Sequence, residues 1–474
     1  MDDRDALLRR TAELAGGFLE RLPDRPVSRA VNLDALRVAL GGPLPVSGED
    51  PLEVIEALAR RAEPGLVGSA GPRYFGFVVG GGVPAALAAD WLASAWDQNA
   101  AMFVMSPAAA VVEEVAARWL LDLFGLPEGC SVGFVTGATM ANFTALAASR
   151  HSLLARAGWN VEEDGLVGAP PIAVVVGEEA HVTILASLQM LGLGRARVHR
   201  VATDGQGRMR VEALRENLAR IAGPALVCAQ AGNVSTGAFD PLAEIVAAVR
   251  ELPNAWLHVD GAFGLWAAAV PGLQDRVAGL GGADSWATDA HKWLNVPYDS
   301  GIVIVRDAAA HHAAMTLGAA YYVETAGGER DGYNWAPESS RRARGFAVYA
   351  ALRSLGRDGL AEMIERCCAL ARRMADGLRR ADGVTILNDV VLNQVLVRFE
   401  PPGGGDADAF TRAVIAAVQV DGTCWLGGTT WHGMAAMRIS VSNWSTTERD
   451  ADLSVEAILR CTREAGATRL TVGG

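Results

Sequence analysis

Short apolar runs alternate with helical patterns along residues 130–306, and this alternation constrains the fold more than any other feature of the sequence. Strands that follow one another through intervening helices form βαβ units, whose parallel strands pair in a buried sheet. The runs that we expect to form strands are 132–136, 172–176, 225–229, 256–259, 284–288 and 301–305. The sequence therefore predicts an α/β protein with a mainly parallel sheet flanked by helices.

Two further regions lie outside this core. Residues 1–72 have helical patterns, and a long helical pattern at 361–380 precedes strand-like runs at 384–387 and 395–399. A helix followed by strands, after a series of alternating units, indicates a separate α+β domain. We therefore expect an N-terminal helical segment (1–72), a large α/β domain (73–350) and a smaller α+β domain (351–474).

Composition narrows the class of protein. No run of eighteen apolar residues is free of charge, and the first ten residues read as an amphipathic helix instead of a signal peptide, so we expect a soluble cytoplasmic protein without a membrane segment. The six cysteines lack CxxC or Cys/His spacing, which favours free thiols and indicates no metal site. A net charge of −12 argues against a nucleic-acid partner, because binding a phosphate backbone requires clustered positive charge.

Lys292 is the only lysine among the 42 basic residues of the chain, and all the others are arginine. Arginine replaces lysine wherever a long positive side chain is enough, but a guanidinium stays charged and cannot attack a carbonyl carbon. A lysine amine can lose its proton and form a Schiff base. The alternative role of Lys292, a surface charge, loses its support because no other surface position uses lysine. Lys292 is therefore the first candidate for a covalent catalytic residue.

Residues just after the strands of a parallel sheet lie at its ligand-binding edge, and three such positions carry suitable groups. Segment 137–139 starts a helix, where backbone amides can bind an anion such as phosphate, or where its threonine is a plain helix cap. Asp260 follows another strand; it can pair with a protonated ring nitrogen, with Ala262 leaving room for a flat ring, or it is an ordinary turn residue. Finally, His291 and Lys292 lie in the connection between the last two strands.

These three groups together match the needs of pyridoxal phosphate. The cofactor requires an anion site, an acidic partner for its pyridinium nitrogen and a lysine that forms a Schiff base. A carboxylate at Asp260 would keep the ring nitrogen protonated, so that the ring can take up the electron pair of a carbanion at the substrate's Cα. The sequence therefore predicts a pyridoxal-phosphate enzyme.

Four motifs resemble those of the group II pyridoxal-phosphate-dependent amino acid decarboxylases, relatives of aromatic L-amino acid and glutamate decarboxylases. The motifs are Thr136-Gly-Ala-Thr-Met-Ala-Asn142, Ala180-His181, His258-Val-Asp-Gly-Ala262 and Asp284-Ser-Trp-Ala-Thr-Asp-Ala-His-Lys-Trp293. The resemblance covers roughly residues 70–350. It implies a fold-type I enzyme, a transferase-like α/β fold, which acts on an L-amino acid as a homodimer with active sites at the subunit interface, the N-terminal segment facing the dimer.

The resemblance also implies a role for each motif residue. Lys292 would form the imine with the cofactor, and Asp260 would pair with the pyridinium nitrogen. Ala262 and His181 would pack on the two faces of the ring. The remaining cofactor contacts that it implies are Gly137, Ala138, Thr139, Asp289 and His291 around the phosphate, and Asn233 near the substrate side of the ring.

Segment 321–344 contains two adjacent glycines, mixed charge and several aromatic residues, a composition typical of a mobile lid. In the family that the chain resembles, a loop here reaches into the partner subunit's site and carries a tyrosine that protonates Cα after carbon dioxide has left. Tyr333 is the best positional match, although the loop differs in length. The alternative is a surface loop whose aromatic residues pack locally.

Three positions depart from the aromatic decarboxylases or leave the substrate open. Glycines occupy 80–82, where those enzymes have a pocket strand with aromatic residues and proline, and Asp289 replaces an asparagine. Arg438 follows a glycine-rich segment and is a candidate for binding a carboxylate, or for an ion pair at the surface or between domains. The substrate is therefore not specified by the motifs.

The favoured hypothesis is decarboxylation of an L-amino acid to its amine through an external aldimine and a quinonoid, with Tyr333 or water delivering the final proton. Because a fold determines the cofactor better than the fate of the carbanion, aldehyde-forming oxidative decarboxylation, transamination and carbon–carbon cleavage stay open. A non-catalytic homologue is the alternative from another class, and the complete set of lysine, aspartate and histidine argues against it.

Overall fold

The computed structural model describes residues 3–316 and 329–472. The chain forms two compact units, one made of Met1–Val79, Leu370–Leu387 and Val395–Gly474, the other of Gly80–Ala369 and Asn388–Gln394. The expected boundary at residue 350 falls inside α12 (Gly345–Arg379), a long helix that runs from one unit into the other and is interrupted only at Gly356, where φ is 64°. A continuous helical pattern therefore crosses the boundary between the units, which is why composition did not mark it.

The larger unit is built on a seven-stranded sheet with the strand order β1-β7-β6-β5-β4-β2-β3. The β3–β2, β2–β4, β4–β5 and β5–β6 pairs are parallel, and β7 is antiparallel to both β6 and β1. The predicted mainly parallel α/β sheet is confirmed. The strands are β1 (Ser131–Val135), β2 (Ala173–Gly177), β3 (His199–Val201), β4 (Ala225–Gln230), β5 (Ala255–Asp260), β6 (Ser285–Asp289) and β7 (Gly301–Val305).

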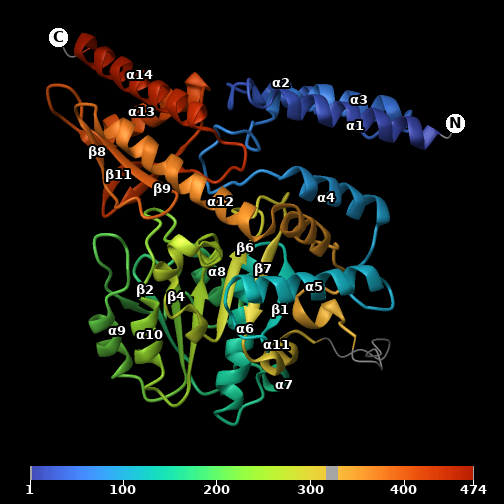
Figure 1. Cartoon of the computed structure of the whole chain (residues 1–474), viewed down its shortest axis with the longest axis vertical. Coiled ribbons are helices and arrows are strands. Elements are labelled where there is room, and N and C mark those ends of the chain that lie inside the picture. The colour runs from blue at the N-terminus through green and yellow to red at the C-terminus, as the bar shows by residue number, and fades with distance from the viewer. Residues whose placement is uncertain (1–2, 317–328, 473–474) are drawn as a thin grey trace. The chain divides into compact units, whose positions relative to one another are not determined.

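Helices surround this sheet because its central strands are buried along their whole length and need an apolar cover. Helix α6 packs on β5, β6 and β7, α8 and α11 pack on α6, and α10 packs on β4 and β5 (Figure 1). The helices of this unit are α4 (Pro84–Trp96), α5 (Pro107–Leu123), α6 (Ala138–Ala155), α7 (Val161–Asp164), α8 (Val182–Met190), α9 (Val211–Leu218), α10 (Leu242–Val249) and α11 (Ala308–Met315), with 3-10 turns η2 (Gly264–Ala269), η3 (Pro271–Val277), η4 (Leu280–Gly282) and η5 (Gly332–Trp335).

The register of the parallel strands brings their carboxyl ends to one edge of the sheet. Gln230 at the end of β4 pairs with Asp260 at the end of β5, and Asp260 pairs in turn with Ala287 of β6. Side chains that follow these strands therefore converge, as expected for a ligand site in a parallel sheet.

The smaller unit contains a four-stranded sheet with the order β10-β11-β9-β8, in which β10 is antiparallel to β11 and β8 to β9. Helix α13 packs on β11 and on α14. The predicted α+β character of the C-terminal region is thus present. Its elements are β8 (Val384–Ile386), β9 (Gln394–Phe399), α13 (Ala407–Asp421), β10 (Gly427–Trp431), β11 (Met434–Ser440) and α14 (Glu448–Val472).

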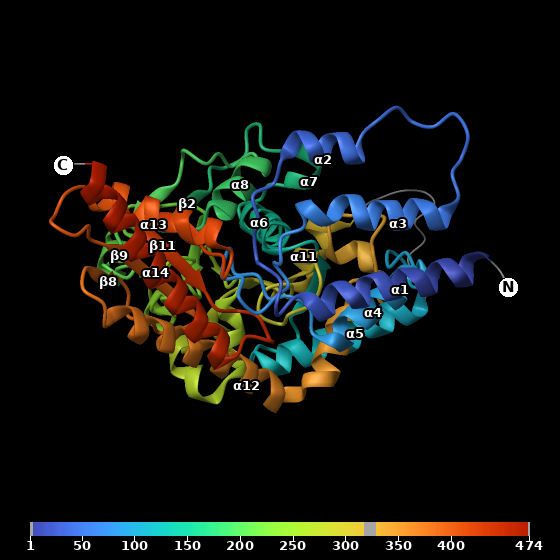
Figure 2. The same ribbon diagram turned by 90° about the horizontal axis from the view of Figure 1, so that it is seen from above.

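The N-terminal helices leave much apolar surface uncovered. They are α1 (Asp3–Arg21), α2 (Leu33–Leu40) and α3 (Pro51–Ala62), followed by η1 (Glu63–Gly65). Helices α1 and α3 lie alongside each other in both views (Figure 1 and Figure 2). Helices α2 and α3 contain no buried residue, and Val38 and Leu58 expose 82% and 53% of their surface. Across the described residues, every helix is too short or too polar to cross a bilayer.

Candidate active site

One small pocket at the carboxyl edge of the large sheet contains several of the predicted residues. Lys292, Asp260, His181 and Ala262 all line it, although they are up to 111 positions apart in the chain. The other residues that line it are Gln230, Gly232, Val234 and Phe263. The lysine and the carboxylate expected at strand ends therefore lie in one pocket with the histidine that the resemblance implied.

Lys292 lies in the turn between β6 and β7, and its side chain is 19% exposed. Its ammonium nitrogen is 2.8 Å from Oδ2 of Asp289, the buried last residue of β6. Gly80 packs against the same turn, since a Cβ at residue 80 would lie only 1.8 Å from the carbonyl oxygen of Lys292. This glycine is therefore needed for the backbone to approach the turn that carries the lysine.

The start of α6 has the features of an anion site. Gly137 precedes the helix without a side-chain cap, and a Cβ there would lie 3.1 Å from His291 and 3.2 Å from Asp289. The amide of Ala138 donates to Oδ1 of Asp289 at 2.5 Å, while Thr139 is exposed. An uncapped first turn offers amide donors and the positive end of the helix dipole, so a phosphate group fits this position chemically.

His291 lies over the same helix end as a neutral donor. Burial disfavours the charged ring and lowers its pKa. This effect is larger than the opposite effect of the nearby Asp289 carboxylate, which raises the pKa. Its Nδ1 accepts a hydrogen bond from the amide of Ser300 at 3.1 Å, so in the neutral ring the proton is on Nε2. Nε2 is 3.4 Å from Oδ1 of Asp289 and can donate to an anion at this site.

Asp260 is 4% exposed, and each of its carboxylate oxygens accepts one hydrogen bond. Oδ1 accepts from the amide of Ala262 at 3.2 Å, and Oδ2 accepts from Nδ2 of Asn142 at 3.3 Å. The protein thus supplies one hydrogen-bond donor to each oxygen and fixes the orientation of the carboxylate. The sequence left two roles open for Asp260, a turn residue or a site residue. Asp260 has both, because it accepts the amide of Ala262 in its own turn and also lines the pocket.

His181 caps the N-terminus of α8, and it is half-buried. Its Nδ1 lies 2.8 Å from Oγ1 of Thr183 and 3.4 Å from the Thr183 amide nitrogen. These contacts fix the ring at the wall of the pocket that contains Lys292. The sequence motif therefore identified a histidine that a helix start holds in position.

Asn233 does not line this pocket in the described structure, although its neighbours on both sides do. It is buried, and its Oδ1 accepts hydrogen bonds from the amides of Ser235 and Thr236 at 2.9 and 3.2 Å. Its side chain therefore holds its own turn. Gln230, which the sequence interpretation missed, lines the pocket instead, and its position at the end of β4 was the signal that could have revealed it.

The predicted lid is described only from residue 329 onward, because Tyr321, Tyr322 and the glycine pair lie outside the described residues. Tyr333 lies in η5, where it is 1% exposed, and its amide donates to the carbonyl of Ala101 at 3.0 Å. The nearby Arg341 pairs with buried Glu113 at 2.9 Å. This part of the segment is therefore packed and not lid-like, because the buried ion pair and the backbone bond anchor it.

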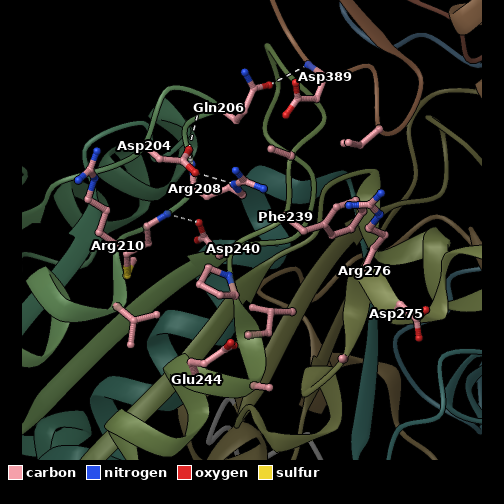
Figure 3. Close-up of a pocket in the computed structure, with 18 of the residues that line it drawn as sticks. Asp204, Gln206, Arg208, Arg210, Phe239, Asp240, Glu244, Asp275, Arg276 and Asp389 are labelled. Atoms are coloured by element: carbon pink, nitrogen blue, oxygen red, sulfur yellow. Dashed lines mark hydrogen bonds and ion pairs between the residues drawn. The ribbon is translucent and has the colours of Figure 1, made fainter.

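A larger hollow lies elsewhere on the same unit, around Asp204, Arg210 and Arg276 (Figure 3). It holds about 1260 Å³ of space between atoms, against about 290 Å³ at Lys292, and part of each volume is open to solvent. The groups that line the hollow are largely satisfied within the protein: Asp204 pairs with Arg208 at 2.7 Å, and Asp240 accepts two backbone amides. No predicted cofactor residue lines it, so size alone does not make it the active site.

Comparison with known proteins decides the family. The conserved domain described as "Pyridoxal-dependent decarboxylase conserved domain" matches residues 38–400. The chain belongs to the pyridoxal-dependent decarboxylase family. It is therefore a pyridoxal-phosphate-dependent enzyme of the amino acid decarboxylase class, with pyridoxal phosphate as its cofactor and an amino acid as its substrate, as the motifs predicted.

Relatives of this decarboxylase have diverse names. An L-2,4-diaminobutyrate decarboxylase of Rhizobium meliloti is 31% identical over 80% of this chain and 75% of its own length, and an aromatic-L-amino-acid decarboxylase of Bacillus atrophaeus is 26% identical over 91% and 89%. A 4-hydroxyphenylacetaldehyde synthase of Rhodiola rosea is 25% identical over 92% and 90%. The crystal structure of Oryza sativa TDC with PLP and tryptamine has a TM-score of 0.91 at 24% identity, covering 98% of both chains, and shows the shared fold-type I architecture.

Proposed function

We propose that this decarboxylase converts an L-amino acid to the corresponding amine, with Lys292 as the residue that binds the cofactor covalently. One observation carries the proposal: the only lysine of the chain shares a pocket with Asp260 and His181 at the carboxyl edge of the sheet. A nucleophilic amine, an acid for a ring nitrogen and an aromatic wall for the ring are the groups that pyridoxal phosphate needs.

The phosphate belongs, in this proposal, at the start of α6. Support comes from the uncapped first turn after Gly137, the amide of Ala138, the hydroxyl of Thr139 and the Nε2 donor of His291. Asp289 would lie beside the phosphate. The amide of Ala138, which now donates to Asp289, would donate to the phosphate instead. We assign to Asn233 the role of holding the turn on the substrate side of the pocket. Gln230 is the side chain that lines the pocket there.

The reaction breaks the bond between Cα and the carboxylate carbon of the substrate, and carbon dioxide leaves. When bound, pyridoxal phosphate supplies the acceptor for the electron pair that remains on Cα. Asp260 would hold the proton of the ring nitrogen, and the two hydrogen bonds to its carboxylate fix the orientation of that group. A proton must then replace the carboxylate at Cα, and Tyr333 or water delivers it. The products are one amine and one carbon dioxide for each amino acid.

The chain acts as a homodimer in this proposal. Support comes from the N-terminal helices, where Leu33, Val38 and Leu58 are exposed apolar residues that a second copy would cover. Resemblance to the family adds that Tyr333 serves the site of the partner subunit. Sedimentation of the loaded enzyme should give twice the mass of one chain, and an active monomer would contradict the assembly.

A cytoplasmic location remains the expectation from the sequence. All six cysteines are free and buried. Burial raises the pKa of Cys367 to about 11, so its thiol stays protonated and unreactive at neutral pH. Free thiols are typical of proteins from reducing compartments. Recovery of the protein from the cytosolic fraction would support this location, and recovery from a secreted fraction would contradict it.

Aldehyde-forming oxidative decarboxylation is the second candidate, and the Rhodiola rosea relative whose name denotes an aldehyde synthase favours keeping it. That reaction consumes dioxygen and water, and it releases an aldehyde, ammonia and hydrogen peroxide in addition to carbon dioxide. The test is a panel of aromatic, acidic and basic amino acids incubated with the loaded enzyme, with amine, aldehyde, keto acid and carbon dioxide measured together. Equal amounts of amine and carbon dioxide are expected. Aldehyde as the main product would support the second candidate, and keto acid without amine would exclude both.

A further inference from the structure

A chain of buried hydrogen bonds runs behind the pocket from Trp256 to Asp260. The indole Nε1 of Trp256 donates to Oγ of Ser285 at 2.8 Å, and the same oxygen lies 2.9 Å from Nδ1 of His258. Nε2 of His258 lies 2.9 Å from Oδ1 of Asn142, whose Nδ2 donates to Oδ2 of Asp260 at 3.3 Å. All five side chains are at least nine-tenths buried, so water cannot replace a missing partner.

The direction of every bond in this chain follows from its two ends. An indole N–H can only donate, so Ser285 accepts from Trp256 and must send its own proton to Nδ1 of His258. An ionised Asp260 can only accept, so the amide nitrogen of Asn142 faces Asp260 and its oxygen faces His258. Both ends therefore require the same form of His258: a neutral ring with its proton on Nε2.

A branch of this chain reaches the other side of the pocket. The second hydrogen of the Asn142 amide points to Oγ1 of Thr183 at 3.2 Å. Since that hydroxyl accepts from Asn142, its own proton is free to be donated to Nδ1 of His181, 2.8 Å away. One asparagine amide thus holds the carboxylate of Asp260 with one hydrogen and the ring of His181, through Thr183, with the other.

We propose that His258 and Asn142 are positioning residues that aim Asp260 and His181 together at the cofactor ring. This proposal rests on the proposed function only in its assignment of Asp260 and His181 to the cofactor. His258 fixes the orientation of the Asn142 amide, because only a donor at its Nε2 position matches the amide oxygen. Asn142 in turn donates a hydrogen bond to one oxygen of the Asp260 carboxylate and so fixes its orientation toward the ring. Without that bond, Asp260 would hold the proton of the ring nitrogen in a poorer geometry, and that nitrogen would be less protonated.

The neutral state of His258 is stable because its surroundings do not favour a charge. Burial lowers its pKa to about 3. The groups that bond to the ring, Ser285 and Asn142, are uncharged, and the carboxylate of this hydrogen-bond network, Asp260, is connected to His258 only through Asn142. A protonated His258 ring would have donors at both nitrogens. Ser285 would then accept from both Trp256 and His258, and its own hydroxyl proton would have no acceptor in this hydrogen-bond network.

The first test uses the cofactor-free protein, so it does not depend on the proposed function. Nitrogen NMR on protein labelled in its eight histidines reports the tautomer and charge of each ring. Among the rings that stay neutral from about pH 5 to pH 9, one with its proton on Nε2 is expected to be absent from the spectrum of His258→Gln, which assigns it to His258. A His258 signal that titrates near its ordinary pKa, or that carries its proton on Nδ1, would overturn the network.

The second test compares substitutions in the loaded enzyme. His258→Gln keeps a donor at the Nε2 position and should retain most of kcat, whereas His258→Leu should lower kcat by about tenfold or more while KM changes little, as for outer hydrogen-bond partners of metal ligands. With a nitrogen-labelled cofactor, His258→Leu and Asn142→Leu should shift the ring-nitrogen signal from protonated toward neutral pyridine. Unfolding of each cofactor-free variant identifies any that merely fail to fold.

His311 provides a matched control. Its ring is fully buried like that of His258, burial lowers its pKa to about 3, and it bonds to a serine, Ser131, at 2.8 Å. His311→Gln should leave the ring-nitrogen signal unchanged. An equal shift in His311→Gln and His258→Leu, or no shift in Asn142→Leu, would overturn the positioning role. A tautomer as predicted in an enzyme that releases no amine would instead contradict the proposed function alone.

Discussion

The ammonium nitrogen of Lys292 lies 2.8 Å from Oδ2 of Asp289, whose other oxygen, Oδ1, accepts the amide of Ala138 at 2.5 Å. One carboxylate therefore bridges the only lysine and the first turn of α6. Both of these groups are assigned to the cofactor in the proposed function, the lysine to its aldehyde carbon and the amide to its phosphate. Asp289 consequently competes with the cofactor at both of its ends.

Replacing Asp289 with asparagine should tighten cofactor binding. A like charge roughly 4 Å from a phosphate costs about 1 kcal/mol even in water and about 4 kcal/mol at a protein surface, so a decrease of at least about tenfold in the pyridoxal phosphate dissociation constant is expected. Equilibrium titration of the cofactor-free protein measures it. Asp284→Asn is the matched control, because it breaks the 2.8 Å pair with Arg250 and should lower stability without tightening the cofactor. Weaker binding by Asp289→Asn would contradict the competition.

Replacing Tyr333 with phenylalanine should divert product from amine to aldehyde. If the Tyr333 hydroxyl delivers the proton to Cα, its loss leaves the carbanion exposed to dioxygen, and amine formation should fall by about tenfold or more, the low end of what a positioned acid contributes. Tyr349→Phe is the control, because this tyrosine stacks on Trp119 at 5.0 Å and has no assigned role in the reaction. Product ratios measured by mass spectrometry should change only in Tyr333→Phe; an unchanged ratio there would assign the proton to water.

Replacing Arg438 with methionine should not destabilise the protein, and it tests whether this residue binds a carboxylate of the substrate. Arg438 is half-buried on β11, burial lowers its pKa, and no ion pair of its guanidinium occurs among the described residues. A buried charge without a partner costs stability, so its removal should be neutral or stabilising. By contrast, Arg398→Met should destabilise by about 1 kcal/mol, because Arg398 pairs with Asp408 at 2.5 Å. If Arg438 holds a substrate carboxylate, KM rises by about tenfold; an unchanged KM would exclude this role.

Stability of the cofactor-free protein should decrease on acidification. Burial lowers the pKa of His258 and His311 to about 3 from 6.5, so below pH 6.5 the unfolded chain takes up protons that the folded chain does not. Each histidine should reduce the free energy of unfolding by about 2 kcal/mol between pH 7 and pH 5. Asp240 acts in the opposite sense, because burial raises its pKa to about 6 and the folded state then binds the extra proton. Urea unfolding should show a flatter pH dependence in His311→Gln and a steeper one in Asp240→Asn; equal slopes would contradict both assignments.

The sequence predicted the strands of the large sheet because they are buried on both faces and so read as continuous apolar runs. The run 225–229, for example, corresponds to β4 at Ala225–Gln230. Three strands were not predicted: β3, β10 and β11. β3 has only three residues, two of them exposed, and β10 is glycine-rich with alternating burial. These two depend on pairing with a neighbouring strand, which is tertiary information that a local pattern does not contain. β11 is largely buried, and its run of apolar residues was not recognised as a strand.

The site residues at strand ends were predictable because topology alone brings them together. Lys292 and Asp260 needed only the rule that ligands lie beyond the carboxyl ends of parallel strands, whereas His181 was expected there because of the resemblance to the family. The network behind them was not predictable, because nothing in the sequence indicates that Asn142 and Ser285 meet the two nitrogens of His258. Such contacts depend on side-chain packing across three elements, so they require coordinates.

Reduction of the loaded enzyme with borohydride shows whether Lys292 binds the cofactor covalently. Reduction converts an imine between the cofactor and a lysine into a stable amine, and Lys292 is the only lysine in the chain. Mass spectrometry should find the reduced pyridoxal phosphate adduct on the peptide that contains Lys292, and Lys292→Arg should carry none. An unmodified Lys292 peptide from fully loaded, active enzyme, or an equal adduct in Lys292→Arg, would contradict the account.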